Sequence, residues 1–167
     1  MNNVILIGMP GCGKSSEGVL LAKVLKKSFV DTDLLIQKCE EMTLQEIIDI
    51  RGNAYFRDVE KEVLLQFNGD NFVVATGGSA VYYPEAMEKF RQGGTVVYIR
   101  LPVETIINRL NNIKTRGISL APGQMIEDLY NERIPLYEKE ADIIVDTEGL
   151  EIEESVAKIA ETLKQNA

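Results

Sequence analysis

The sequence predicts an α/β fold in which helices cover both faces of a parallel β-sheet. Two observations predict it. Short runs rich in Val and Ile alternate with longer amphipathic segments along the chain, and no repeat, linker or low-complexity tract interrupts them. The chain has 167 residues, of which 45% are hydrophobic and 26% charged, as in an ordinary globular domain. We therefore expect a single domain over residues 1–167.

Each expected element has a local signal. Short apolar runs mark the strands, and the span from Thr43 to Glu46 fits a capping box at a helix start. Pro84 and Pro102 suit the first position of a helix, and Gly93 suits a stop. The expected order is a strand at 4–7, a helix at 14–27, a strand ending at 31, helices toward 50 and over 55–66, a strand at 72–75, a helix at 84–91, a strand at 96–101, helices at 102–110 and 124–140, a strand at 143–145 and a helix at 152–165.

The net charge of −8 restricts the possible partners. An acidic surface repels nucleic acids and acidic membranes, so we expect neither as a partner. The longest apolar run, Val4–Ile7, is too short to span a membrane, and no basic segment precedes it, so we expect a cytoplasmic protein. With no histidine and two cysteines, Ser-His-Asp, Cys-His and zinc chemistry are disfavoured.

The segment from Gly8 to Ser15 reads GMPGCGKS and matches the phosphate-binding motif G-x-x-x-x-G-K-[ST]. Glycines allow backbone N–H groups to surround phosphate oxygens, and the following helix directs its positive end at the same anion. Lys14 would reach the β- and γ-phosphates of ATP, and the Ser15 hydroxyl would bind Mg²⁺. The expected ATP-binding residues here are Gly11, Cys12, Gly13, Lys14, Ser15 and Ser16, with Cys12 an ordinary loop residue rather than a nucleophile.

Two carboxylates follow the second expected strand, in Asp31-Thr32-Asp33. Ligands of open α/β sheets bind at the carboxyl ends of the strands. Asp31 would suit Mg²⁺, through water, and Asp33 would suit a substrate hydroxyl, as acceptor or general base. The alternative is an Asx turn that caps the next helix. A third feature is the long segment 111–123, with Asn, Gly and Pro, which we expect to be a functional loop rather than a plain connection.

In this order, the motifs resemble the shikimate kinase family over nearly the whole chain. The segments that carry the resemblance are the phosphate loop, Asp31-Thr32-Asp33, residues 51–57 (RGNAYFR), Ala75-Thr76-Gly77-Gly78, Arg116-Gly117 and residues 133–137 (RIPLY). The resemblance implies a three-layer P-loop NTPase fold with a five-stranded parallel sheet. It also implies an acceptor-binding helical region over about 33–66 and a mobile lid over about 111–123.

The resemblance also implies roles for single residues. Asp33 would contact ring hydroxyls and Arg57 and Arg133 the carboxylate of the acceptor, which suits the planar fork of arginine. Lys14, Asp33 and Arg116 would be catalytic, with Arg116 the lid arginine near the phosphates. Arg109 would lie beside the adenine, and Gly77, Gly78 and Ser79 would line the acceptor pocket. The implied reaction transfers the γ-phosphate of ATP, with Mg²⁺, to shikimate in aromatic amino acid biosynthesis.

Three positions depart from the usual residues of the family, and alternative functions therefore stay open. Asn53 stands where the family usually has Glu, Ser79 where it has a third Gly, and Gly117 where it has Pro. The alternative acceptor is another hydroxy acid, such as homoserine, whose ammonium would need an acidic partner. A different alternative is a regulator that uses ATP as a switch. A monomer is favoured, and we expect Tyr82 and Tyr83 to pack rather than to bind a ligand.

Overall fold

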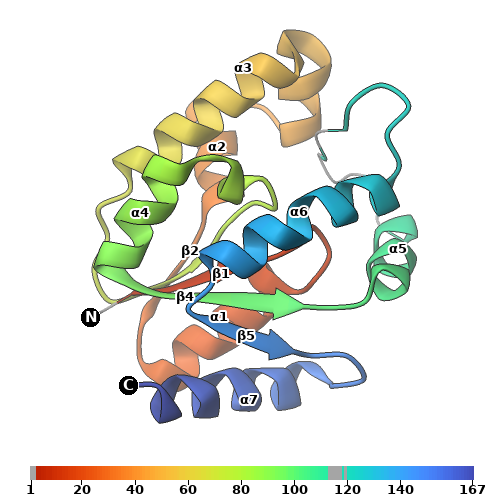
Figure 1. Cartoon of the computed structure of the whole chain (residues 1–167). Coiled ribbons are helices and arrows are strands. Elements are labelled where there is room, and N and C mark those ends of the chain that lie inside the picture. The colour runs from red at the N-terminus through yellow and green to blue at the C-terminus, as the bar shows by residue number, and fades with distance from the viewer. Residues whose placement is uncertain (1–2, 113–117, 119) are drawn as a thin grey trace.

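The computed structural model describes residues 3–112, 118 and 120–167. The chain alternates strands and helices as the sequence predicts (Figure 1). In chain order the elements are β1 (Asn3–Ile7), α1 (Lys14–Leu25), β2 (Ser28–Asp31), α2 (Thr32–Glu40), α3 (Leu44–Gln66), β3 (Phe72–Ala75), a 3₁₀ turn (Ala80–Tyr82), α4 (Pro84–Gly93), β4 (Gly94–Arg100), α5 (Val103–Asn111), α6 (Ile126–Glu140), β5 (Ile143–Asp146) and α7 (Ile152–Gln165).

The five strands form one parallel sheet in the order β2-β3-β1-β4-β5. The central strand β1 is buried along its whole length, and Leu6 pairs with Ala75 on one side and Val97 on the other. Because all strands run the same way, their carboxyl ends meet at one edge, on the right of Figure 1. The predicted five-stranded parallel α/β fold is confirmed.

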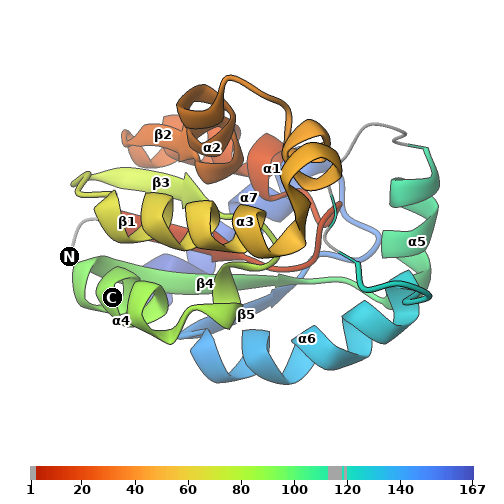
Figure 2. The same ribbon diagram turned by 90° about the horizontal axis from the view of Figure 1, so that it is seen from above.

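Helices cover both faces of this sheet, with α1 and α7 on one face and α4 and α6 on the other (Figures 1 and 2). The main core lies between these layers. A smaller apolar cluster, separate from it, joins α2 to α3 through Ile36, Ile47 and Phe56. This second cluster makes α2 and α3 a helical unit at the β2 side of the molecule, beside the carboxyl ends of the strands.

The structure differs from the expected elements in two places, at helix α2 and at the end of α1. Helix α2 received no range in the sequence analysis, although Asp31 caps it by accepting a hydrogen bond from the Asp33 backbone. The two helices expected on either side of Gly52 are confirmed, and they join in α3 across a kink where Gly52 adopts φ 86° and ψ 166°. Helix α1 ends at Leu25 because Lys26 takes a left-handed conformation. Within the described part of the chain, no helix is long and apolar enough to cross a membrane.

Candidate active site

The phosphate loop connects the end of β1 to the start of α1, at the carboxyl edge of the sheet. Gly11 and Gly13 adopt φ values of 82° and 106°, which residues other than glycine rarely adopt. At Gly8, with φ 147°, an added Cβ would lie 2.8 Å from the Ile99 carbonyl oxygen. The glycines therefore allow the tight turn that directs the first N–H groups of α1 into the loop.

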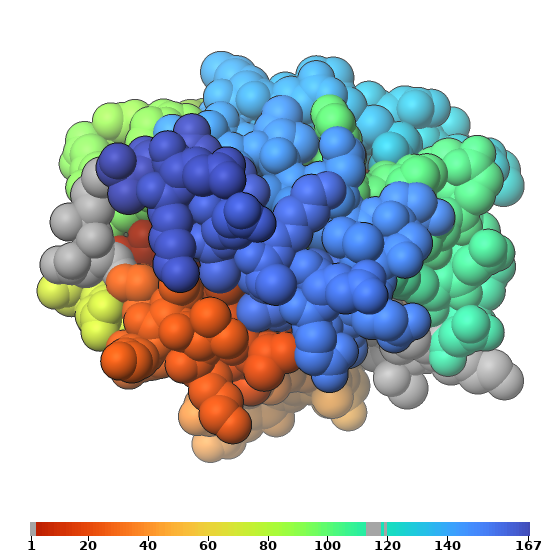
Figure 3. All heavy atoms as spheres, turned by 90° about the horizontal axis from the view of Figure 1, so that it is seen from below, coloured from red at the N-terminus to blue at the C-terminus, as the bar shows by residue number. Residues whose placement is uncertain are grey.

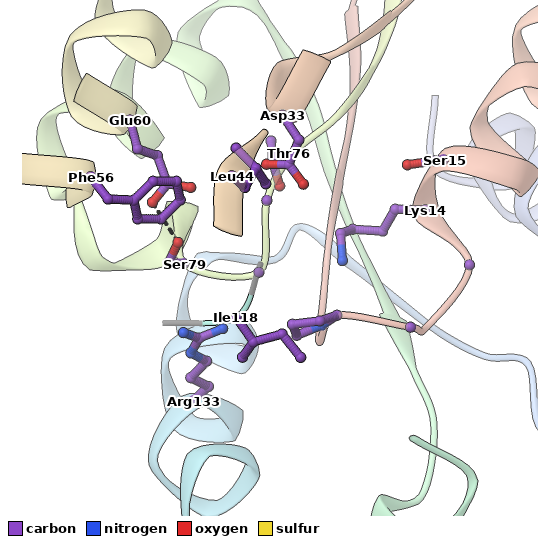
Figure 4. Close-up of a pocket in the computed structure, with 15 residues that line it drawn as sticks. Lys14, Ser15, Asp33, Leu44, Phe56, Glu60, Thr76, Ser79, Ile118 and Arg133 are labelled. Atoms are coloured by element: carbon purple, nitrogen blue, oxygen red, sulfur yellow. Dashed lines mark hydrogen bonds between the residues drawn. The ribbon is translucent and has the colours of Figure 1, made fainter. Parts of the chain in front are cut away.

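The Lys14 ammonium lies across this loop and is 7% exposed. Its Nζ donates hydrogen bonds to the carbonyl oxygens of Gly8 (2.7 Å) and Met9 (2.9 Å), and it lies 3.6 Å from the Cys12 sulfur. The loop thus holds one positive charge among its own carbonyl groups, at the wall of the cavity shown in Figure 4. Cys12 is 1% exposed, as expected of a structural loop residue.

Ser15 and Asp31 are in direct contact, although they lie on different elements. The Ser15 Oγ donates a 2.6 Å hydrogen bond to Asp31 Oδ2, while Asp31 Oδ1 accepts the Asp33 N–H at 2.9 Å. Asp31 therefore forms the expected helix cap and also reaches the phosphate loop. Hydroxyl and carboxylate oxygens are the hard ligands that Mg²⁺ prefers, alongside water, so the donor set fits this ion. Among the described residues, no group of three or more Asp, Glu, Cys or His side chains forms a closed metal site.

A cavity next to the phosphate loop is lined by Gly77 and Gly78, which follow β3 after Thr76. A Cβ added at Gly77 would lie 2.7 Å from Asp33 Oδ1 and 2.8 Å from Glu60 Oε2. A Cβ at Gly78 would lie 2.8 Å from Arg133 Nη1. Two carboxylates and a guanidinium thus approach this short backbone segment so closely that a side chain there would require them to shift. The lining residues are Pro10, Gly11, Gly13, Lys14, Ser15, Asp33, Leu44, Phe56, Glu60, Thr76, Gly77, Gly78, Ser79, Ile118 and Arg133.

Arg57 and Arg133 come from different helices, α3 and α6, and both approach the Tyr82 side chain. The two guanidinium carbons lie 6.0 Å and 5.2 Å from the centre of the Tyr82 ring. Arg133 is 3% exposed and also donates a 3.4 Å hydrogen bond from Nε to the Tyr82 hydroxyl. Tyr82 therefore packs against two arginine side chains of this chain.

Glu60 is the site residue that the sequence analysis missed. It is 1% exposed, and its Oε1 accepts hydrogen bonds from the Ser79 hydroxyl and from the Tyr83 hydroxyl at 2.9 Å. Burial raises its pKa, and these hydrogen bonds and the Arg133 and Arg57 charges oppose that shift. Ser79 has φ −90°, so its backbone does not need glycine, and its hydroxyl points to Glu60.

A second cavity, of about 400 Å³, lies on the other side of the phosphate loop. Arg109, from α5, lies at this cavity and donates a 3.2 Å hydrogen bond from Nη1 to the Gly11 carbonyl oxygen. The lining residues are Gly11, Gly13, Ser16, Glu17, Arg109, Asn112, Leu150 and Ile152. Arg116 lies outside the described residues, as do the other residues of 113–117 and residue 119 of the predicted lid. Of the segment 111–123, Ile118 lines the first cavity, and the Leu120 carbonyl oxygen lies 3.5 Å from Asn53 Nδ2.

A phosphate loop with one cavity on each side, at the carboxyl edge of a parallel sheet, is typical of P-loop kinases that act on small molecules. The chain matches the family model described as shikimate kinase over residues 10–164. The chain belongs to the shikimate kinase family, and it is an ATP-dependent phosphotransferase.

Individual relatives agree with this assignment. The chain is 40% identical to a shikimate kinase of Thermodesulfovibrio yellowstonii over 162 residues, which cover 95% of this chain and 93% of that protein. It is 36% identical to one from Clostridium botulinum, covering 99% and 98%. The solved shikimate kinase of Acinetobacter baumannii, in complex with shikimate, has a TM-score of 0.91 at 31% identity, covering 99% of this chain and 94% of that one. The solved Aquifex aeolicus shikimate kinase has a TM-score of 0.82 at 36% identity, covering 98% and 97%.

Proposed function

We propose that this protein transfers the γ-phosphoryl group of ATP to a hydroxyl of shikimate, forming shikimate 3-phosphate and ADP. The observation that carries the proposal is the arrangement around Gly77 and Gly78, with Asp33 and Glu60 on one side and Arg133 on the other. A ring acid with hydroxyl groups and one carboxylate matches such a cavity. The relative solved with shikimate supports this acceptor.

Asp33 is the residue that would bind the hydroxyl of the acceptor and take its proton. Its Oδ1 lies next to Gly77, in the cavity that also contains Lys14 and Ser15. As the hydroxyl oxygen bonds to the γ-phosphorus, the bond from that phosphorus to the β-phosphate oxygen breaks, and Asp33 takes the hydroxyl proton. Arg133 and Arg57 would hold the acceptor carboxylate away from the phosphates and thereby set which hydroxyl faces the phosphate loop.

The phosphate side would work by charge and position. Lys14 would exchange its loop carbonyl partners for β- and γ-phosphate oxygens, and Arg116 of the lid would add a second positive charge at the transferred group. Mg²⁺ would be held by Ser15, with Asp31 contacting it through water, and when bound it neutralises charge on the phosphate oxygens. Closure of the segment 111–123 would exclude water and limit ATP hydrolysis.

The experiment that tests the acceptor is a comparison of kcat/KM for shikimate and homoserine, with purified protein, ATP and Mg²⁺. Shikimate is expected to be preferred. The Asp33 and Glu60 carboxylates around Gly77 could also receive an ammonium group, so homoserine is the proper competitor. A higher kcat/KM for homoserine would contradict the proposed acceptor and leave the phosphotransferase. The sequence left open a regulator that uses ATP as a switch. Membership of the shikimate kinase family favours an enzyme instead.

A further inference from the structure

Glu17, in the first turn of α1, is a buried carboxyl group that the reaction described above does not use. It is 4% exposed, and within the described part of the chain its Oε2 is buried without a hydrogen-bond partner. Its one side-chain hydrogen bond comes from Ser155, which is 1% exposed, on α7. Helix α7 (blue) lies against α1 (orange) on the face of the molecule seen in Figure 3. Buried polar atoms without a partner are uncommon, so this one calls for an explanation.

Stability does not explain the presence of Glu17. An apolar side chain between α1 and α7 would avoid the desolvation of a carboxylate. The position therefore retains a group that costs stability, as is common for residues that serve a binding site.

The surroundings of Glu17 place it at the nucleotide side of the phosphate loop. A Cβ added at Gly13 would lie 3.1 Å from Glu17 Oε1, so the carboxyl group lies directly behind the last glycine of the loop. Glu17 lines the second cavity together with Arg109. The charged groups that act on it are Arg109 from α5 and Lys14 from α1, whereas α7 contributes the neutral Ser155.

Arg109 is a long, flexible side chain that needs more than one contact to keep a fixed position. Its Nη1 donates to the Gly11 carbonyl oxygen, and its charge is attracted to the Glu17 carboxylate, which lines the same cavity. The two attractions act from two elements, the phosphate loop and α1. A carboxylate at this position repels phosphate groups, so any benefit to nucleotide binding must come through the nucleoside end.

We propose that Glu17 is a positioning residue for the nucleotide, which holds the Arg109 guanidinium in the cavity where the nucleoside part of ATP binds. The inference rests on the proposed ATP site, with Arg109 beside the base. Glu17 itself does not touch the reacting atoms. It acts through Arg109, and Ser155 fixes the carboxyl group from the α7 side.

The test compares two ligands that share phosphates and differ in the nucleoside. Binding of ATP and of inorganic tripolyphosphate, both with Mg²⁺, is measured by calorimetry for the parent and for Glu17→Gln. We expect Glu17→Gln to weaken ATP binding about three- to tenfold, the range of one hydrogen bond or close charge contact, and to leave tripolyphosphate binding within about twofold. Glu161→Gln, on the exposed side of α7, is the matched control and should change neither.

Combined substitutions test whether Glu17 acts through Arg109. In an Arg109→Gln background, Glu17→Gln should weaken ATP binding no further, because its effect passes through Arg109. Glu17→Asp keeps the charge but shortens the side chain, and it should also weaken ATP binding selectively. Parent-like ATP binding by both Glu17 variants overturns the inference, and so does equal weakening of both ligands, which would mean that Glu17 only supports the loop. A parent protein that binds tripolyphosphate but not ATP would instead contradict the proposed ATP site.

Discussion

Arg133 contacts Tyr82 in two ways, because its Nε donates a 3.4 Å hydrogen bond to the Tyr82 hydroxyl while its guanidinium carbon lies 5.2 Å from the ring centre. The guanidinium carbon of Arg57 lies 6.0 Å from the centre of the same ring. Like charges repel, and an aromatic face attracts cations, so the ring stabilises two arginines close together. Tyr82 thus brings two positive charges to the same aromatic ring, where we propose that the acceptor carboxylate binds.

The first prediction follows from this arrangement. Tyr82→Ala should raise the KM for shikimate about three- to tenfold, as the loss of a cation–π contact of roughly 0.5–2 kcal/mol would do, with little change in kcat. Tyr82→Phe keeps the ring and should have a smaller effect. Steady-state kinetics with shikimate varied would check both. Equal effects of the two variants would show that the hydroxyl, and not the ring, aligns the arginines.

Arg133 and Arg57 should contribute more to acceptor binding than Tyr82 does. A charged hydrogen bond is worth roughly 1.5–3 kcal/mol, so Arg133→Ala and Arg57→Ala should each weaken acceptor binding about ten- to a hundredfold. Arg133 is buried and Arg57 is exposed, so the Arg133 change should be the larger. Binding of shikimate is the measurement, and binding of ATP is the control, which should stay near the parent value. Unchanged shikimate binding in both variants would eliminate the carboxylate role.

Lys14→Ala should lower kcat by about 10²–10³, the typical cost of removing one preorganised charge stabiliser. The fold should survive, because the side chain bonds only to the phosphate loop and its cysteine. Turnover is measured beside the far-UV circular dichroism spectrum. A folded variant whose turnover stays within about threefold of the parent would contradict the assignment of Lys14 as a charge stabiliser.

The prediction for Arg116 rests only on its proposed role as the lid arginine near the phosphates. Arg116→Ala should lower kcat more than it raises the KM for shikimate, because an interaction made mainly in the transition state acts on kcat. Steady-state kinetics separates the two constants. A change confined to KM would instead place Arg116 among the acceptor-binding residues.

Glu17 gives a pH-dependent prediction for stability. Its pKa is about 7 in the folded protein and near the ordinary 4.5 when unfolded, so between these values the folded state binds more protons. The Glu17 contribution to the free energy of unfolding therefore falls as pH rises through this window. Glu17→Gln should be more stable than the parent at pH 8, by roughly 1–3 kcal/mol, and nearly equal to it at pH 4.5.

Urea denaturation of both proteins at the two pH values, without nucleotide or Mg²⁺, measures the difference. Glu161→Gln serves again as control, since that side chain is exposed. A stability difference that stays the same at both pH values would mean that the carboxyl group of Glu17 does not titrate in this range.

The sequence predicted what is decided locally. The strands, the phosphate loop and the capping box at Thr43 carry their signals within a few residues, and the structure confirms them. Which side chains become buried or contact one another is decided by packing between segments that are distant in the sequence. Glu60 and Glu17 look like ordinary charged helix positions until burial by other elements is known, so the sequence could not single them out.

Asp31 and Ser79 show the same limit in another form. The helix cap and the contact with Mg²⁺ were treated as alternatives for Asp31, yet one carboxylate oxygen caps α2 while the other accepts a hydrogen bond from Ser15, which leaves room for both roles. Ser79 was expected to line the acceptor pocket; it lines the cavity beside the phosphate loop, and its hydroxyl donates a hydrogen bond to Glu60. Sequence patterns assign a residue to a site more readily than they assign its individual atoms.

The crowding at Gly77 and Gly78 has a consequence for inhibitor design. A Cβ introduced at either position would lie within 2.8 Å of an atom of Asp33, Glu60, Arg133 or Pro10, so the side chains around the cavity would have to shift. With the acceptor site proposed above, a compound whose affinity comes from this backbone segment would meet a surface that the protein alters only by shifting its own substrate site. Resistance by substitution at these two positions should then lower kcat/KM for shikimate, and resistant variants should arise elsewhere in the chain.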